Sequence, residues 1–272
     1  MINANRGAHR RRWTPGDIDT SLWIDVKDYS TLTFNGNYIS GIHDKSGNSY
    51  DLSQAAAAYQ PLYSSTGING LPALSFDGVN DRLVNSSFFL SSRFSKYIVY
   101  NNKATEGVLS SLIISESLSS GSKIVNELLL SNNYSGYKDI SVTAMEKTPC
   151  FGCDIEGVHG ENNIINYSWN GIDKNDVGNY SIYHNGDNIN LSGSGNVGYL
   201  ANEGGLSIGM RNLQKFLPFY GLISEILIID YSESVDDVAK VFGYLAHKFF
   251  NDVGVSNPLP SNHKYKNIPP ML

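Results

Sequence analysis

Short runs of alternating apolar and polar residues, separated by turn residues, recur along the chain and constrain its fold more than any other feature. In the segment NYSIYHNGDN the dipeptide Asn185-Gly186 stands between two such runs. Asn-Gly is typical of a two-residue hairpin turn, which needs positive φ at both central positions. Alternation then places Tyr180, Ile182 and His184 on one face of the first strand. The segment therefore predicts a hairpin in a sheet with one buried side.

Further runs of this kind predict strands over most of the chain. They span residues 21–26, 38–43, 82–86, 96–100, 109–115, 125–131, 139–145, 164–169, 180–184 and 205–209, with further strands through Phe76 and over 221–230. Short strands at such spacing favour an antiparallel β-sandwich over a parallel sheet with crossover helices. With 272 residues, 41% of them hydrophobic, the chain is long enough to form one such domain with a substantial core.

A single helix is predicted over residues 234–251. Its apolar residues recur at steps of three and four, and they are Val235, Val238, Phe242, Leu245 and Phe249. Ser232 or Ser234 is placed to cap the first turn, where two aspartates also favour the helix dipole. We expect this helix to cover part of a sheet.

The two ends of the chain differ in composition from the body, residues 21–251. Residues 1–20 form a basic arm, whose predicted docking residues are Arg6, Arg10, Arg11, Arg12 and Trp13. Subtracting the four arginines from the net charge of −6 leaves −10 for the remainder. Four of the nine prolines fall in the last fifteen residues, so we expect residues 252–272 to be extended, lying along the body or reaching to a neighbour.

The charge distribution and hydropathy also limit the partners. An acidic body argues against nucleic acid as the main partner, and the basic arm is expected to dock onto an acidic partner subunit rather than onto nucleic acid or lipid headgroups. No apolar run follows the basic cluster, which argues against a secretory leader. The apolar run 222–229 is interrupted by Ser224 and Glu225, so no membrane insertion is expected and the chain is expected to be made in the cytoplasm.

Several longer segments carry a family resemblance. In chain order they are RRRWTPGDIDTSLWIDV, SLWIDVKDYSTLTF, ISGIHDKSGNSYDLSQ, YQPLYSSTGINGLPALSFDGVNDRL, YSIYHNGDNI, LSIGM, FYGLISEILIIDYSESVDDVAKVFGYLAHKFF and LPSNHKYKNIPP. Together they resemble the concanavalin A-like, laminin-G-like jelly-roll family, and the first is similar to the start of such domains in tailed-bacteriophage structural proteins. His43 and the pair Phe249-Phe250 depart from the pattern, because relatives usually carry tryptophan there, but both keep an aromatic ring.

The resemblance implies an all-β jelly roll of two antiparallel sheets, with ligand-binding loops at the rim of a concave face. Aromatic rings can stack on the apolar face of a sugar, and planar polar groups can bind its hydroxyls. The predicted ligand-binding residues are Asp77, Asn80, Asp81, Tyr167, Trp169 and Tyr183.

Calcium is the one cofactor for which the sequence offers ligands, because carboxylates and amide carbonyls in loops are what this ion takes. Asp77 with Asp81, or Asp173 with Asp176, would supply them. The alternative is that these residues only build turns, which their side chains do well by bonding to the nearby backbone.

Cys150 and Cys153 form the motif Cys-Phe-Gly-Cys. They supply only two of the four ligands that a structural zinc needs, and His159 is the one nearby candidate for a third. A metal site, a local disulfide and a pair of reduced residues in a turn all remain open, and the turn is favoured.

The sequence contains no clear motif of catalytic residues. A retaining glycosidase needs two carboxylates roughly 5 Å apart, and the nearest candidates, Glu156, Glu161, Asp173 and Asp176, fall in expected loops. No Gly-x-Ser-x-Gly motif occurs, and the six histidines are scattered.

We therefore expect a protein that is not an enzyme: a lectin-like bacteriophage virion protein, attached by its terminal arms to other virion proteins. A homo-oligomer that contacts host-surface carbohydrate or decorates the particle fits this hypothesis. A polysaccharide hydrolase on the same fold and a purely structural assembly protein are the alternatives.

Overall fold

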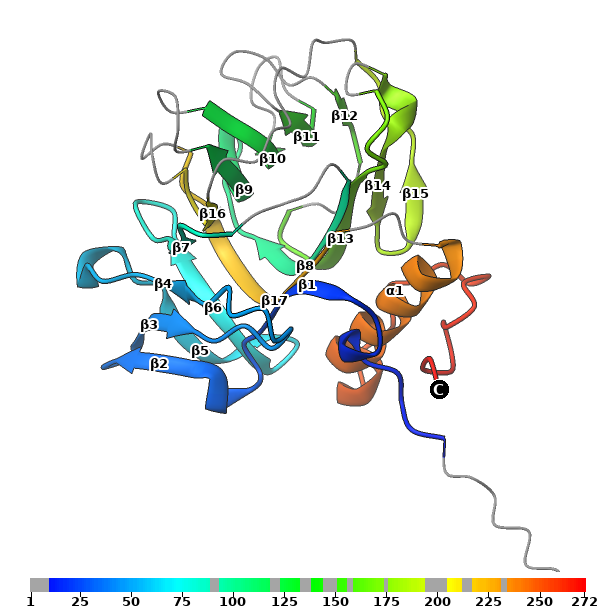
Figure 1. Ribbon diagram of the computed structural model, residues 1–272, viewed down its shortest axis with the longest axis horizontal. Helices are drawn as coiled ribbons and strands as arrows, with labels where there is room; N and C mark the ends of the chain where they lie inside the picture. Colours follow the sequence, from blue (N-terminus) through cyan, green and yellow to red (C-terminus); the bar gives the residue numbers. More distant parts are fainter. Residues whose placement is uncertain are drawn as a thin grey trace, which may run out of the picture.

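The computed structural model describes residues 10–88, 93–117, 123–132, 138–143, 151–155, 159–173, 176–193, 205–211, 217–230 and 234–272. Strands are the main regular structure of this part, and all pairings between them are antiparallel. One α-helix follows the last strand and lies against the outside of the sheet (Figure 1). The predicted all-β sandwich with one C-terminal helix is confirmed.

The elements follow one another along the chain in short pieces. The strands are β1 (Thr20–Asp25), β2 (Leu32–Asn35), β3 (Tyr38–Ile42), β4 (Leu52–Ser53), β5 (Leu62–Ile68), β6 (Leu71–Asp77), β7 (Leu83–Asn85), β8 (Phe94–Asn102), β9 (Val108–Ser117), β10 (Lys123–Asn132), β11 (Ile140–Thr143), β12 (Phe151–Cys153), β13 (Asn162–Trp169), β14 (Tyr180–His184), β15 (Asp187–Ile189), β16 (Leu206–Ile208) and β17 (Tyr220–Ile229). The helix is α1 (Val235–Phe249), and short 3-10 turns occur at η1 (Pro15–Asp17), η2 (Tyr29–Thr31), η3 (Ala57–Tyr59), η4 (Val177–Asn179) and η5 (Asn251–Val253).

Strand β17 is the centre of the first layer. Strand β8 pairs along one of its edges, and β6 followed by β1 pairs along the other. Beyond β8 the layer continues through β13, β14 and β15. The second layer contains β12, β11, β10, β9, β16 and β7 in this order, and β5 joins β6 to β3 at the edge where the two layers meet.

The strands of the first layer are apolar on both faces because both faces are covered. Ile98 of β8 points into the core between the layers, whereas its neighbours Tyr97 and Val99 point to the side of α1. Tyr97 meets Phe242 of the helix with ring centroids 5.6 Å apart. Alternation along a strand therefore divides the apolar residues between two cores.

Helix α1 begins as predicted. The Ser234 hydroxyl accepts a hydrogen bond from the Asp237 N–H at 3.1 Å and so caps the first turn. The predicted apolar stripe is correct from Val238 onward, but Val235 is 85% exposed because the first turn extends past the sheet. No helix in the described part is both long and apolar enough to cross a membrane.

Both ends of the described chain lie on its own body. The Trp13 N–H donates to the Pro270 carbonyl at 2.9 Å, and the Trp13 ring is buried. In the tail, Leu259 is buried against the hairpin at Gly186. Of the two expectations for the tail, lying along the body is therefore the one that the structure shows.

The arginines of the arm are partly engaged within the chain. Arg11 pairs with Asp17 and Arg12 pairs with Asp252, while Arg10 is exposed. Arg6 lies outside the described residues. Docking of the arm onto another subunit stays a prediction.

Candidate functional site

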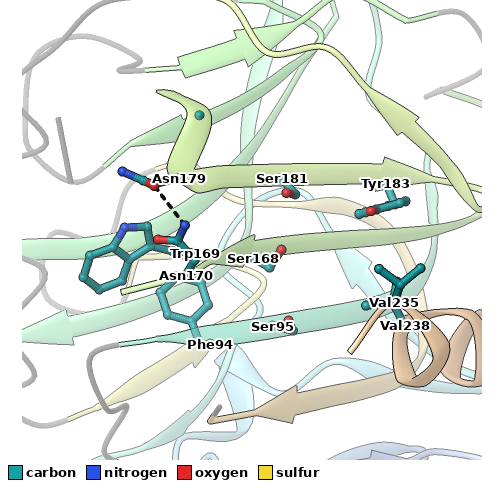
Figure 2. Close-up of a pocket in the computed structure, with 11 residues that line it drawn as sticks. Phe94, Ser95, Ser168, Trp169, Asn170, Asn179, Ser181, Tyr183, Val235 and Val238 are labelled. Carbon is teal, nitrogen blue, oxygen red and sulfur yellow. Dashed lines mark hydrogen bonds between the residues drawn. The ribbon is translucent and has the colours of Figure 1, made fainter. Parts of the chain in front are cut away.

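A groove of about 170 Å³ crosses the ends of β8, β13 and β14 beside the first turn of α1 (Figure 2). We call it the serine groove, and its lining residues are Phe94, Ser95, Ser168, Trp169, Asn170, Gly178, Asn179, Ser181, Tyr183, Val235 and Val238. It contains side chains from three strands, one loop and the helix.

Three serines form the middle of the groove. In the register of the sheet, Ser168 lies opposite Ser95 on one side and Ser181 on the other, and Figure 2 shows the three side by side. Neighbouring strands are about 4.8 Å apart, so the hydroxyls form a short row across the sheet. None of the three hydroxyls is hydrogen-bonded to another residue of the described chain. Each can therefore donate and accept hydrogen bonds to a ligand.

One end of the groove combines aromatic rings and amides. Trp169 contacts Phe94 with ring centroids 6.4 Å apart, and its buried indole N–H has no hydrogen-bond partner. Beside it, the Asn170 side-chain amide donates to the Asn179 side-chain carbonyl at 2.8 Å, the bond dashed in Figure 2. This pair holds the loop between β13 and β14 against the groove.

The other end of the groove is apolar. Tyr183 packs on Phe242 with ring centroids 5.9 Å apart, and Val235 and Val238 of α1 lie beside it (Figure 2). Among the described residues, no charged side chain lines the groove. Free hydroxyls between aromatic and aliphatic walls fit an uncharged ligand that carries hydroxyls on an apolar frame.

Of the three aromatic residues predicted to bind a ligand, two line the serine groove and one is buried in the core. Trp169 and Tyr183 line the serine groove. Tyr167 does not, because it is fully buried between the layers, where its ring meets Phe94 at 5.2 Å. The prediction that Tyr167 contacts a ligand is therefore wrong: Tyr167 points to the core face of β13, whereas its neighbour Ser168 points to the groove.

Asp77, Asn80 and Asp81 lie at the end of β6 and do not line the serine groove. The Asp77 carboxylate accepts the N–H groups of Val79 and Asn80 at 2.8 and 3.2 Å, and the Asp81 carboxylate accepts the Asp77 N–H at 2.9 Å. Burial raises the pKa of Asp81 to about 6, and the nearby charge of Asp77 adds to this effect. These side chains build a turn, as the alternative to a ligand site predicts.

The second candidate calcium pair also belongs to a turn. The Asp176 carboxylate accepts the Gly178 N–H at 2.9 Å and caps η4, while the Asp173 carbonyl accepts the Asn179 amide at 3.0 Å. Within the described ranges, no three or more His, Cys, Asp or Glu residues are grouped so as to hold a metal ion. Calcium binding stays a prediction.

The residues considered for zinc do not come together in the part that is described. Cys153 is buried and free, and burial raises the pKa of its thiol to about 12. His159 is engaged elsewhere, with Nδ1 2.7 Å from the Asn102 amide and Nε2 2.7 Å from the Ser131 carbonyl. Cys150 lies outside the described residues.

A charged cluster lies under the C-terminal half of α1. Lys248 Nζ is 2.8 Å from an Asp25 oxygen and 2.6 Å from a Glu225 oxygen, and these two carboxylates face each other across β1 and β17. Trp23 and Tyr244 donate to the other Glu225 oxygen at 2.8 and 3.0 Å. Every carboxylate oxygen of Glu225 therefore has a partner.

The pKa values of the two carboxylates in this cluster are shifted in opposite directions. Burial alone would raise the pKa of Asp25, but the ammonium groups of Lys248 and Lys45 outweigh burial and lower it. For Glu225 complete burial dominates and raises the pKa, although Lys248 opposes this shift. The cluster fastens the helix to the sheet through charges that are removed from water.

Comparison with known proteins identifies the fold but no family. No protein-family model matches the chain, and no curated protein matches it. Among solved structures it is similar to Trypanosoma rangeli sialidase in complex with sialic acid, at 12% identity and a TM-score of 0.54 over 81% of this chain and 32% of that one. It is also similar to a GH54 α-L-arabinofuranosidase, at 16% identity and a TM-score of 0.54 over 82% of this chain and 61% of that one.

A third similar structure is the binding domain of Paraclostridial Mosquitocidal Protein 1, at 12% identity and a TM-score of 0.51 over 84% of this chain and 52% of that one. The chain thus spans about a third of the sialidase and between half and two thirds of the other two. What these likenesses show is a β-sandwich fold that occurs in carbohydrate-active proteins.

One expectation from the sequence is overturned by these comparisons. The expectation that the chain is not an enzyme is contradicted, because a sialidase and an arabinofuranosidase are among the structures that its fold resembles. At 12 to 16% identity the likeness concerns the fold, so the activity of the chain is a matter for proposal.

Proposed function

We propose that the chain recognises uncharged carbohydrate through the serine groove. The observation that carries this proposal is the row of three unpaired hydroxyls on Ser95, Ser168 and Ser181, with aromatic rings at both ends. Sugar hydroxyls can exchange hydrogen bonds with such a row, and the apolar faces of the sugar rings can pack on the aromatic walls. The carbohydrate-active proteins among the similar structures support a carbohydrate ligand in general, and the restriction to uncharged sugars rests on the lining of the groove.

The serine row offers a direct test on a glycan array followed by calorimetry of the best ligand. Replacing Ser168 and Ser181 together with alanine is expected to weaken binding about tenfold, because two hydrogen bonds of about 0.5 to 1.5 kcal/mol each are lost. Ser64→Ala, a strand serine outside the groove, is the control and keeps full affinity. Equal affinity of the double variant and the wild type would count against the groove.

Hydrolysis of a glycan is the second candidate, favoured by the two enzymes among the similar structures. The candidate carboxylate pair is Asp25 with Glu225, which lie opposite each other in the sheet and are bound by the same ammonium group. Incubation of the array ligands with the wild type, followed by detection of released sugar, tests this candidate. Turnover that survives in Glu225→Gln would exclude this pair as its source.

Assembly into a bacteriophage particle, as a concanavalin A-like or laminin-G-like component, belongs to the same proposal and is supported by the sequence resemblance alone. Mass spectrometry of purified virions tests it. Peptides of this chain in the particle would support a role in host-surface adhesion or decoration, and their absence would count against it.

A further inference from the structure

The first described residues of the chain and its C-terminal residues bind each other beside the end of α1. The Trp13 N–H donates to the Pro270 carbonyl at 2.9 Å, and the Leu272 N–H donates to the Arg11 carbonyl at 3.1 Å. An ion pair between Arg12 and Asp252 fixes the arm to the turn after the helix. Figure 1 shows the first described residues and the C-terminus beside α1. The serine groove is lined by Val235 and Val238 of the first turn of this helix, whereas the pair between Arg12 and Asp252 lies after its last turn.

Residues 11–13 and 269–272, which we call the clasp, contribute one side of the lining of a cavity of about 360 Å³, the clasp cavity. Three aromatic rings form its walls: Tyr244 meets Trp13 at 6.2 Å and Trp23 at 6.5 Å, edge to face in both cases. Pro269 and Pro270 of the tail add to the apolar lining. The volume falls within the range of small-molecule sites, which is about 300 to 1,000 Å³.

The charges around the cavity are balanced except at one position. Lys248 is shared by Asp25 and Glu225, and Lys45 is bound by Asp25 at 3.0 Å and by a second aspartate of the same turn. Lys27 lines the cavity and is exposed, and its ammonium group forms no ion pair with any residue in the described part of the chain. A cation is therefore available beside an apolar space.

We propose that the clasp cavity binds a small ligand with a flat apolar body and one carboxylate, with the body against the aromatic and proline walls and the carboxylate on Lys27. The aromatic and proline side chains offer contact to an apolar body, and the arginine, the aspartates and the other lysines of the lining are already in ion pairs within the described chain, so they offer little to a ligand that needs many hydrogen bonds. A single carboxylate is matched by the single unpaired ammonium group. This site is separate from the serine groove and does not depend on the proposed carbohydrate function.

The test compares 2-naphthoate with the uncharged 2-naphthamide by calorimetry on the full chain. We expect 2-naphthoate to bind about threefold to fivefold more tightly, since the ion pair with the exposed Lys27 is the difference between the two probes. Lys27→Gln removes this preference while leaving the binding of the amide unchanged. Lys103→Gln, which changes an exposed lysine outside the cavity, retains the preference.

A second variant locates the site. Trp13→Leu removes one wall and is expected to weaken both probes several-fold, with the thermal unfolding midpoint measured alongside. The proposal is overturned if neither probe binds saturably, if both bind equally, or if the two lysine variants behave alike. Stronger binding of glucuronate than of 2-naphthoate would also overturn it, because a sugar acid would then be the preferred class of ligand.

Discussion

Replacing Lys248 with methionine is expected to lower the free energy of unfolding by about 3 to 5 kcal/mol at pH 7. The side chain lies between two carboxylates that are almost completely removed from water, and within the described residues no other ammonium group forms an ion pair with Glu225. Removing one partner of a buried ion pair leaves an uncompensated charge, which costs far more than the pair contributes. Urea unfolding followed by circular dichroism measures the loss.

Lys240→Met is the matched control for this prediction. Lys240 is on the same helix and pairs with Asp236 at 2.9 Å and with Asp237 at 3.4 Å, but these pairs lie at the surface. Exposed pairs of this kind contribute about 0 to 1 kcal/mol, so the control should be almost as stable as the wild type. If both lysine variants lost the same small amount, the cluster under the helix would not be what fastens it.

The Lys248 variant should also respond to pH in a characteristic way. Without the ammonium group, burial raises the pKa of Glu225 in the folded state further above its value in the unfolded chain. At Glu225 the folded state then binds more protons than the unfolded state in this range, so the deficit in stability relative to the wild type shrinks as the pH is lowered from 7 towards 5. A smaller difference between the variant and the wild type at pH 5 than at pH 7 would identify the unpaired carboxylate as the cause of the loss.

Local signals in the sequence predict the hairpin and the helix because both are determined within a few residues. Asn185 and Gly186 have φ angles of 53° and 89°, the positive values that the turn requires. Ser234 caps α1 from the position directly before the first residue of the predicted apolar stripe. In both cases the residues that decide the structure are neighbours along the chain.

The serine groove could not be predicted in this way. Ser95 and Ser168 become neighbours only because β8 pairs with β13 in one register, and a shift by one residue would turn their side chains to the other face. The partial exception is Tyr167, which is two residues from Trp169. Alternation places both rings on the same face of β13, opposite to Ser168. That face belongs to the core between the layers, and of the two rings only Trp169, at the end of the strand, also reaches the groove.

The path of the two terminal segments could not be predicted from local sequence either. An extended segment rich in proline has the same local preferences whether it packs on its own body or on a neighbour. What decides between the two are contacts over long sequence distances, such as the hydrogen bond from Trp13 to Pro270. Only the three-dimensional arrangement brings these partners together.

Acidification is expected to destabilise the protein through His184. This side chain is 6% exposed, its Nε2 atom has no hydrogen-bond partner, and burial lowers its pKa to about 4. An imidazole in the unfolded chain has a pKa of about 6.5, so between pH 6.5 and 4 the unfolded state binds the proton and the folded state does not. The stability that the neutral ring contributes is complete above pH 6.5 and is lost as the pH falls through this window, by about 3 kcal/mol.

The measurement is the free energy of unfolding from pH 7 to pH 4 for the wild type and for His184→Leu. Because leucine cannot bind a proton, the variant should lose less stability on acidification, and the difference between the two curves should change by about 3 kcal/mol across the window. Ile182→Val, on the same strand and same face, removes volume but no ionisable group, so it should cost about 1 kcal/mol at every pH. Parallel curves for the wild type and the leucine variant would show that other groups, and not this buried ring, carry the acid sensitivity.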